Sequence, residues 1–404
     1  MNHRLLLLFV GCFWALAGTP TEAQIRIEKP AGEKIGIHLA GLQVGSDAAS
    51  TEFMQALRTN LERSGWFRVV GAGQAEIAVS GRVQPRGNEL RVECRVTGTQ
   101  NRQTYINQSY RHAANDARRL AQRITDDIVE QVTGRPGIAS SRIVIVGSSG
   151  RNRELYMIDP DGSNLTQLTS DRNTSVRPRF GSNARELTYT GYLQGFPDVY
   201  LVDLESGDRR AISRSSGLNT GGQISPNGQE VALILSKDGN PELYVMQLRS
   251  GRLTRLTNTP AANEASPSWS PDGSEIVYVS DQTGRPQLYI ISRTGGAPRR
   301  ITTRGTENVS PDWGDNGLIA YTTRVGRQYQ IAIMDPRSGE VRNISDPAGG
   351  DFEDPSWAPN GRHLAVAQRQ NFRSQIYIID TAGDAPVRLT PARGDWYTPA
   401  WSPK

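Results

Sequence analysis

The chain has 404 residues, with 46 lysines and arginines against 41 aspartates and glutamates and a formal net charge of +5 at pH 7. Only Lys29, Lys34, Lys237 and Lys404 are lysines, so nearly all of the positive charge is arginine scattered among carboxylates. A nucleic-acid-binding protein gathers its basic residues on one face, and the lack of any basic run here excludes that class.

The first 23 residues, 1–23, are predicted to be a cleaved export signal. His3-Arg4 precedes an apolar run, and Thr21-Glu22-Ala23 supplies small residues before a cut. The run is too short to span a membrane stably. Cleavage after Ala17 and a lipoprotein signal at Cys12 stay open as weaker alternatives.

Residues 24–136 are predicted to form a small α/β domain that begins with a short arm. Strand patterns at 35–39, 66–70, 77–83 and 90–96 accompany helical patterns around Leu57 and Ile124. About 110 residues are enough for a core of their own. Cys94 falls on the apolar face of its strand and is expected to be a buried small hydrophobe. Without Cys12 the mature chain has no second cysteine for an intramolecular disulfide.

Residues 137–404 carry a repeat with a period of about 44 residues, which is typical of propeller blades. Its clearest copy begins Trp269-Ser270-Pro271-Asp272-Gly273, and Pro-Asp-Gly favours a tight turn. Each copy predicts four short strands, a to d, and the copies together predict a six-bladed β-propeller.

The repeat is divided between the two ends of this region. The first strand b, Ile143-Val144-Ile145-Val146, has no strand a before it, and the last strand a, Pro399-Ala400-Trp401-Ser402-Pro403, has no strand b after it. We therefore expect the C-terminal strand to complete the first blade and close the ring, which removes exposed sheet edges.

Signals for catalysis are weak. After removal of the signal, the histidines are His38, His112 and His363, and none lies in a zinc-ligand spacing. Propellers of this kind also precede serine peptidase domains, but no Gly-x-Ser-x-Gly motif is present. We expect no enzyme, no cofactor and no structural metal. Calcium in the channel stays an open alternative, because carboxylates recur just before strand a.

Several strings resemble one family along the whole chain. They are Glu242-Leu243-Tyr244-Val245-Met246, Ser280-Asp281-Gln282-Thr283-Gly284-Arg285-Pro286-Gln287 and Gly295-Gly296-Ala297-Pro298-Arg299-Arg300-Ile301-Thr302. Together with the signal, the α/β domain and the terminal strand, they are similar to the TolB family, the periplasmic propeller proteins of the Tol-Pal system in Gram-negative bacteria.

The resemblance implies a non-catalytic periplasmic adaptor that supports outer-membrane integrity and constriction at cell division. Such an adaptor would bind the lipoprotein Pal on one propeller face and TolA through its N-terminal arm, here Gln24-Ile25-Arg26-Ile27-Glu28. By similarity, the Pal-facing residues share one loop position in successive repeats: Asn219, Thr220, Glu264, Ala265, Ser266, Glu307, Asn308, Glu353 and Asp354.

Connectivity suggests which face is open to a partner. The chain enters the ring at the start of a strand b, so the N-terminal domain should lie on the side of the Pro-Asp-Gly turns. The opposite loops should present an inner acidic ring and an outer basic ring, formed respectively by Glu264, Glu307, Asp351, Glu353, Asp354 and Asp395, and by Arg151, Arg153, Arg285, Arg324, Arg327, Arg369 and Arg373. An orphan ligand-binding propeller and the separated propeller of a peptidase are the alternative functions.

Overall fold

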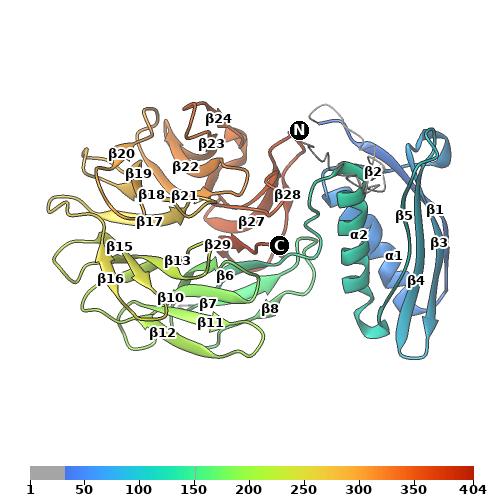
Figure 1. The fold of residues 1–404 in the computed structure, drawn as a ribbon, viewed down its shortest axis with the longest axis horizontal. Helices are drawn as coiled ribbons and strands as arrows, with labels where there is room; N and C mark the ends of the chain where they lie inside the picture. The colour runs from blue at the N-terminus through green and yellow to red at the C-terminus, as the bar shows by residue number, and fades with distance from the viewer. Residues whose placement is uncertain (1–31, 151) are drawn as a thin grey trace, which may run out of the picture.

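The computed structural model describes residues 32–150 and 152–404. The expected export signal, 1–23, the expected arm, 24–28, and Arg151 of the expected basic ring lie outside the described residues. A small domain of one sheet and two α-helices is followed by a ring of six four-stranded sheets (Figure 1). The predicted fold class is confirmed.

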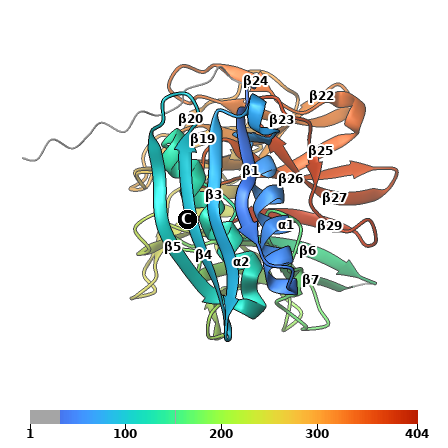
Figure 2. The same ribbon diagram turned by 90° about the vertical axis from the view of Figure 1, so that its right-hand side faces the viewer.

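The N-terminal domain is a five-stranded sheet of order β2-β1-β3-β4-β5. Its elements are β1 (Ile35–Val44), α1 (Ala48–Arg63), β2 (Phe67–Val69), the 3-10 turn η1 (Ala72–Gln74), β3 (Ile77–Arg86), β4 (Glu89–Gly98), β5 (Thr104–Ala113), the 3-10 turn η2 (Ala114–Asp116) and α2 (Ala117–Thr133). Both helices lie between the sheet and the ring (Figure 1), and Figure 2 views the sheet from its outer side.

The boundaries of the two helices follow from local chemistry. Asp47 caps α1, since its carboxylate accepts a hydrogen bond from the Ser50 amide at 2.9 Å. Gly134, at φ +70°, ends α2, because that left-handed conformation costs glycine little. Cys94 is buried, as expected, and burial raises the pKa of its thiol to about 12.

Strand β5 was not among the predicted strands. Of its ten residues only Tyr105, Ile106 and Tyr110 are buried, so its sequence lacks the strict alternation that marks a half-buried strand. It lies at the edge of the sheet, where one side is left without a neighbouring strand.

The six sheets are the blades of a propeller, each with strands a to d running outward from the central channel. In order of strand a they are blade 1, β9 (Ser175–Phe180), β10 (Glu186–Gly191), β11 (Asp198–Asp203) and β12 (Arg209–Ser213); blade 2, β13 (Asn219–Ile224), β14 (Glu230–Leu235), β15 (Glu242–Gln247) and β16 (Leu253–Arg255); blade 3, β17 (Glu264–Trp269), β18 (Glu275–Ser280), β19 (Gln287–Ser292) and β20 (Arg299–Arg300); blade 4, β21 (Asn308–Trp313), β22 (Ile319–Val325), β23 (Gln328–Met334) and β24 (Val341–Asn343); blade 5, β25 (Asp351–Trp357), β26 (His363–Gln370), β27 (Arg373–Asp380) and β28 (Val387–Arg388); and blade 6, β29 (Trp396–Trp401), β6 (Ile143–Ser149), β7 (Asn152–Ile158) and β8 (Thr166–Gln167). A 3-10 turn, η3 (Pro347–Gly349), precedes β25.

Blade 6 is built from both ends of the propeller sequence, as predicted. Strand β29 pairs antiparallel with β6, and Trp401 lies opposite Ile143. The Trp401 indole is 5% exposed and donates a hydrogen bond to the Ser141 hydroxyl at 2.7 Å. The C-terminal strand is therefore fixed to the segment that enters the ring.

A recurring hydrogen bond joins the innermost strands of successive blades. A side chain at the fifth position of strand a accepts from the backbone amide of the aromatic at the sixth position in the next blade. The pairs are Gln223 with Trp269, Ser268 with Trp313, Asp312 with Trp357 and Ser356 with Trp401, at 2.7 to 3.0 Å. These bonds fix the blades around the channel wall.

The N-terminal domain contacts the ring on the side of the a–b and c–d turns. Arg362, after the a–b turn of blade 5, donates to the Gly65 carbonyl at 2.9 Å and lies over the Trp66 ring. Gln122 of α2 donates to Asp159, in the c–d turn of blade 6, at 2.7 Å. These contacts lie on the side expected from connectivity, and they leave the other side, which we call the free face, to the d–a and b–c loops.

Candidate functional site

All nine residues proposed to face a partner lie on the free face, around the channel. They occupy four successive positions at the start of strand a. Strand β25 begins one residue earlier than the other strands a, so blade 5 is counted from Phe352. Glu307 is the residue before the strand; Asn219, Glu264 and Asn308 are first; Thr220, Ala265 and Glu353 are second; Ser266 and Asp354 are third. The repeat therefore brings the nine residues to one region, but their side chains have different environments.

The three residues at the first position are buried, with exposed fractions of 1% for Asn219, 2% for Glu264 and 0% for Asn308. The Asn219 amide donates to the Ser215 carbonyl at 2.7 Å, and the Asn308 amide donates to the Arg304 carbonyl at 2.8 Å. Each asparagine thus fixes the d–a loop before its own strand. In this structure these three side chains shape the loops and present no surface to a partner.

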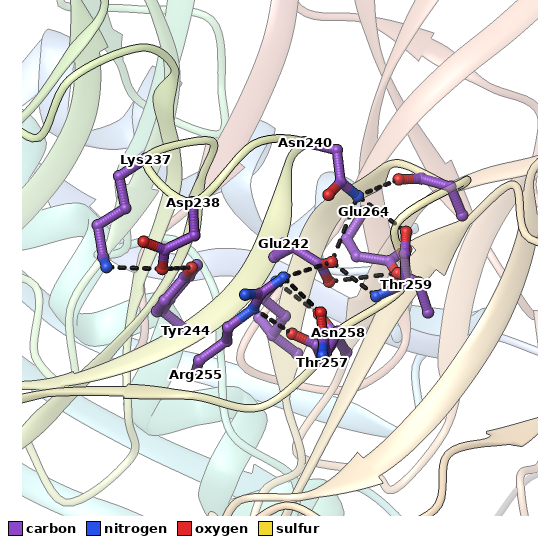
Figure 3. Close-up of polar contacts among 12 residues, drawn as sticks. Lys237, Asp238, Asn240, Glu242, Tyr244, Arg255, Thr257, Asn258, Thr259 and Glu264 are labelled. Carbon is purple, nitrogen blue, oxygen red and sulfur yellow. Dashed lines mark hydrogen bonds and ion pairs between the residues drawn. The ribbon is translucent and has the colours of Figure 1, made fainter.

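Glu264, which was expected in the acidic ring presented by the loops, is buried instead. One of its oxygens accepts a hydrogen bond from the Thr259 hydroxyl, and the other is buried without a partner (Figure 3). Burial raises the pKa of the Glu264 carboxyl, and the charges of Glu242 and Asp281 add to the rise. Glu264 begins β17 and lies beneath the loop that carries Thr259, which explains the burial.

The neighbouring carboxylate, Glu242, is the centre of a polar network at the same loop (Figure 3). It pairs with Arg255 at 2.9 Å and accepts from the Thr259 amide at 2.6 Å. Burial opposes its ionisation, but hydrogen bonds from Thr257, Thr259 and Arg255 outweigh burial and lower its pKa. The network fixes the loop between blades 2 and 3, and we read it as structural.

The third position of strand a is a left-handed β-bulge in every blade. The residues are Arg177, Gly221, Ser266, Ser310, Asp354 and Thr398, with φ between +43° and +74°. In each blade the strand register shifts at this position, so that two residues of strand a lie opposite one residue of strand b. The bulge residues line a cavity of about 210 Å³ at the mouth of the channel.

Opposite charges lie on different sides of this mouth. The Arg177 guanidinium donates to the Ser266 hydroxyl at 3.1 Å. The Asp354 carboxylate accepts from the Ser310 hydroxyl at 2.7 Å. A partner that enters the channel mouth would therefore meet two hydroxyl groups, the positive charge of Arg177 and the negative charge of Asp354.

The expected inner acidic ring and outer basic ring are not separate. Arg324 of the b–c hairpin in blade 4 pairs with Glu307 at 2.8 Å, and Arg369 of blade 5 pairs with Glu353 at 3.5 Å. A hydrogen bond from the Tyr329 hydroxyl and the Arg324 guanidinium hold the pKa of Glu307 below its usual range. Arg324 and Arg369 thus reach inward from the hairpins and neutralise Glu307 and Glu353.

An ion pair deeper in the channel was missed by the sequence analysis. Arg179 of blade 1 pairs with Asp312 of blade 4 at 2.9 Å, and blades 1 and 4 are opposite each other in the ring. Burial raises the pKa of Asp312, and the Arg179 charge opposes that rise. Arg179 lines both the mouth cavity and a second cavity of about 140 Å³ towards the N-terminal domain. The signal was present, because both residues hold the fifth position of strand a.

Among residues 32–150 and 152–404, no group of three or more His, Cys, Asp or Glu side chains could hold a metal ion. Within the same residues, no helix is both long and apolar enough to cross a membrane.

Comparison with known proteins decides the family. The model of the TolB β-propeller domain matches residues 129–404. The chain belongs to the TolB propeller family. The structure is similar to the crystal structure of TolB from Acinetobacter baumannii, with a TM-score of 0.84 and 26% identity over 93% of this chain and 98% of that one.

Two curated relatives carry the name Tol-Pal system protein TolB. The Syntrophotalea carbinolica protein is 31% identical over 202 residues, covering 43% of this chain and 46% of the relative. The Paramagnetospirillum magneticum protein is 32% identical over 211 residues, covering 45% of this chain and 47% of the relative. In these matches the chain covers about half the length of each curated relative.

Proposed function

We propose that this chain is a non-enzymatic periplasmic adaptor of a Tol-Pal system, which binds a Pal-like lipoprotein on the free face of its propeller. The observation that carries the proposal is the similarity to a TolB structure across both domains, 93% of the chain. In this role the protein supports outer-membrane integrity and constriction at cell division.

The form of the free face supports binding rather than catalysis. Its carboxylates are paired with arginines or held by hydroxyls, as for Glu307 with Arg324 and Asp354 with Ser310. Paired surface charges contribute little to folding but shape the potential that a partner meets. The N-terminal domain occupies the opposite side, so the free face is accessible to a second protein.

We assign the second partner, a TolA-like protein, to the arm formed by residues 24–28. The described chain begins at Gly32, where an added Cβ atom would lie 3.5 Å from the Ala382 carbonyl of blade 5. Lys34 pairs with Asp384 in the same turn at 2.6 Å. The described chain therefore begins beside blade 5, whose other end carries Asp354 at the channel mouth. This blade offers a physical connection between the two proposed partner sites.

Calorimetry with the soluble domain of the Pal-like lipoprotein tests the first assignment. Glu307→Lys places a positive charge beside Arg324 and reverses the local charge, and we expect at least about tenfold weaker binding, or about 1.4 kcal/mol. The control is Glu340→Lys, a charge reversal of an exposed residue in the same blade on the opposite side. It should leave the affinity unchanged. Absence of binding by the wild type would contradict the proposal.

A further inference from the structure

The b–c hairpin of blade 5 ends in a phenylalanine that is fully exposed. Phe372 has a relative exposure of 101%, and it forms the tip of the hairpin with Asn371, between β26 and β27. Each of these two strands has eight residues, whereas the equivalent strands of blades 1, 2 and 3 have six. The hairpin therefore extends farther from the ring on the free face than the corresponding strands of those blades.

The backbone at this tip is unfavourable for the residue it carries. Asn371 has φ +51° and Phe372 has φ +63°. Two-residue hairpin turns with both residues left-handed favour Asn-Gly, because glycine has no Cβ to clash. A bulky residue at positive φ is a genuine outlier. Phe372 is therefore strained and also exposes an aromatic ring to water, and neither feature stabilises the fold.

Backbone strain of this kind persists at sites where it serves binding or catalysis. The surroundings of Phe372 have features of a binding surface. Val325, at the end of β22 in the neighbouring blade 4, is 52% exposed. Arg327 and Arg373 are exposed, and neither makes an ion pair with any described residue. The two hairpin tips thus carry apolar side chains flanked by unpaired guanidinium groups.

The hairpin is connected to the channel mouth by polar contacts. Arg369, near its tip, pairs with Asp351 at 3.1 Å and with Glu353 at 3.5 Å, both in the innermost strand β25. Asp351 also accepts a hydrogen bond from the Tyr329 amide of blade 4 at 3.0 Å. The tip of blade 5 and the mouth of the channel therefore belong to one continuous surface.

We propose that Phe372 is an anchor that inserts into an apolar pocket of the protein bound on the free face. This inference rests on the proposed function, and it adds the chemistry of the partner: an apolar pocket bordered by carboxylates that complement Arg327 and Arg373. Exposed aromatics that fill a partner's pocket dominate many interfaces. A protein fits better than an anionic membrane, since Glu307, Asp351 and Glu353 on the same surface offset the charge of Arg324 and Arg369 and leave few free cations to attract anionic lipid.

The test compares Phe372→Gly with wild type by calorimetry against the soluble domain of the Pal-like lipoprotein and by thermal unfolding. Glycine removes the ring and suits the left-handed turn, so the variant should melt at the same or a higher temperature and bind at least tenfold more weakly. Phe196→Ala is the matched control, because Phe196 is 73% exposed in a b–c loop of blade 1 and is not at positive φ. It should bind within about threefold of wild type.

Four results would overturn the inference. The first is that Phe372→Gly binds the Pal-like domain as tightly as the wild type, and the second is that Phe372→Gly and Phe196→Ala lose the same affinity. The third is that Phe372→Gly melts at a lower temperature than the wild type. The fourth is that the wild type binds phosphatidylglycerol vesicles and Phe372→Gly does not, because the ring would then serve a membrane. If wild-type protein does not bind the Pal-like domain at all, the proposed function fails instead, and this distinguishes the two failures.

Discussion

Removing one side chain tests the closure of the ring. Trp401→Ala deletes a buried indole of the C-terminal strand. Replacing a buried Phe or Trp by Ala lowers the free energy of unfolding by about 3–5 kcal/mol. The indole also donates to Ser141 at 2.7 Å, and such a hydrogen bond contributes about 1 kcal/mol. The expected loss is about 4–6 kcal/mol, a large fraction of the stability of a typical domain, about 5–15 kcal/mol.

Calorimetric unfolding measures this loss. For 150–250 residues, 1 kcal/mol shifts the melting temperature by about 2–4 °C, so Trp401→Ala should lower it by roughly 8–24 °C. Trp401→Phe, the control, keeps an aromatic ring and loses the donor, and should shift the melting temperature by less than half as much. Deleting residues 399–404 should destabilise the ring at least as much as Trp401→Ala. A deletion variant that melts with the wild type would refute the closure of blade 6 by β29.

Two further predictions concern the arm and the buried carboxyl. Deleting residues 24–29 should abolish binding to a TolA-like protein while the propeller stays folded. Through coupling of the two sites, it should also change the affinity for the Pal-like domain by roughly 5–150-fold. Calorimetry with each partner measures both effects, and normal TolA binding would contradict the assignment. Glu264→Gln should flatten the pH dependence of stability, because burial raises the pKa of Glu264 and the wild type therefore loses stability as pH rises through that pKa. Urea unfolding between pH 4 and 8 measures it, and parallel curves for the two proteins would count against a buried, perturbed carboxyl.

The repeat made most of the fold predictable from sequence. Pro-Asp-Gly turns and apolar triplets predict six blades from the sequence alone. The unmatched strands at Ile143 and Trp401 predict that one of the six is built from both ends of the propeller sequence. Edge strand β5 was not predictable in the same way, since only three of its residues are buried. A period of two in apolar residues arises when one face of a strand is buried. An edge strand with few buried positions therefore shows only a weak period in its sequence.

The candidate site was predictable in position and not in environment. Loop position in the repeat places Glu264 and Glu307 near each other on the ring, but only the structure shows that one is buried and the other is paired with Arg324. The left-handed bulge was also hidden. Ser266 and Asp354 precede prolines, and local sterics favour extended backbone before proline, yet both have φ near +50° because the ring requires a bulge there.

The central claim is that the free face of the propeller binds the partner, and amide hydrogen exchange measures it most directly. Exchange is compared for the protein alone and in the presence of the soluble Pal-like domain. The account predicts slower exchange in the d–a loops at 214–218 and 303–307 and at the hairpin tip, 371–372, with no change in the a–b turns at 271–273 and 359–361. Protection confined to those a–b turns or to the N-terminal domain would contradict it.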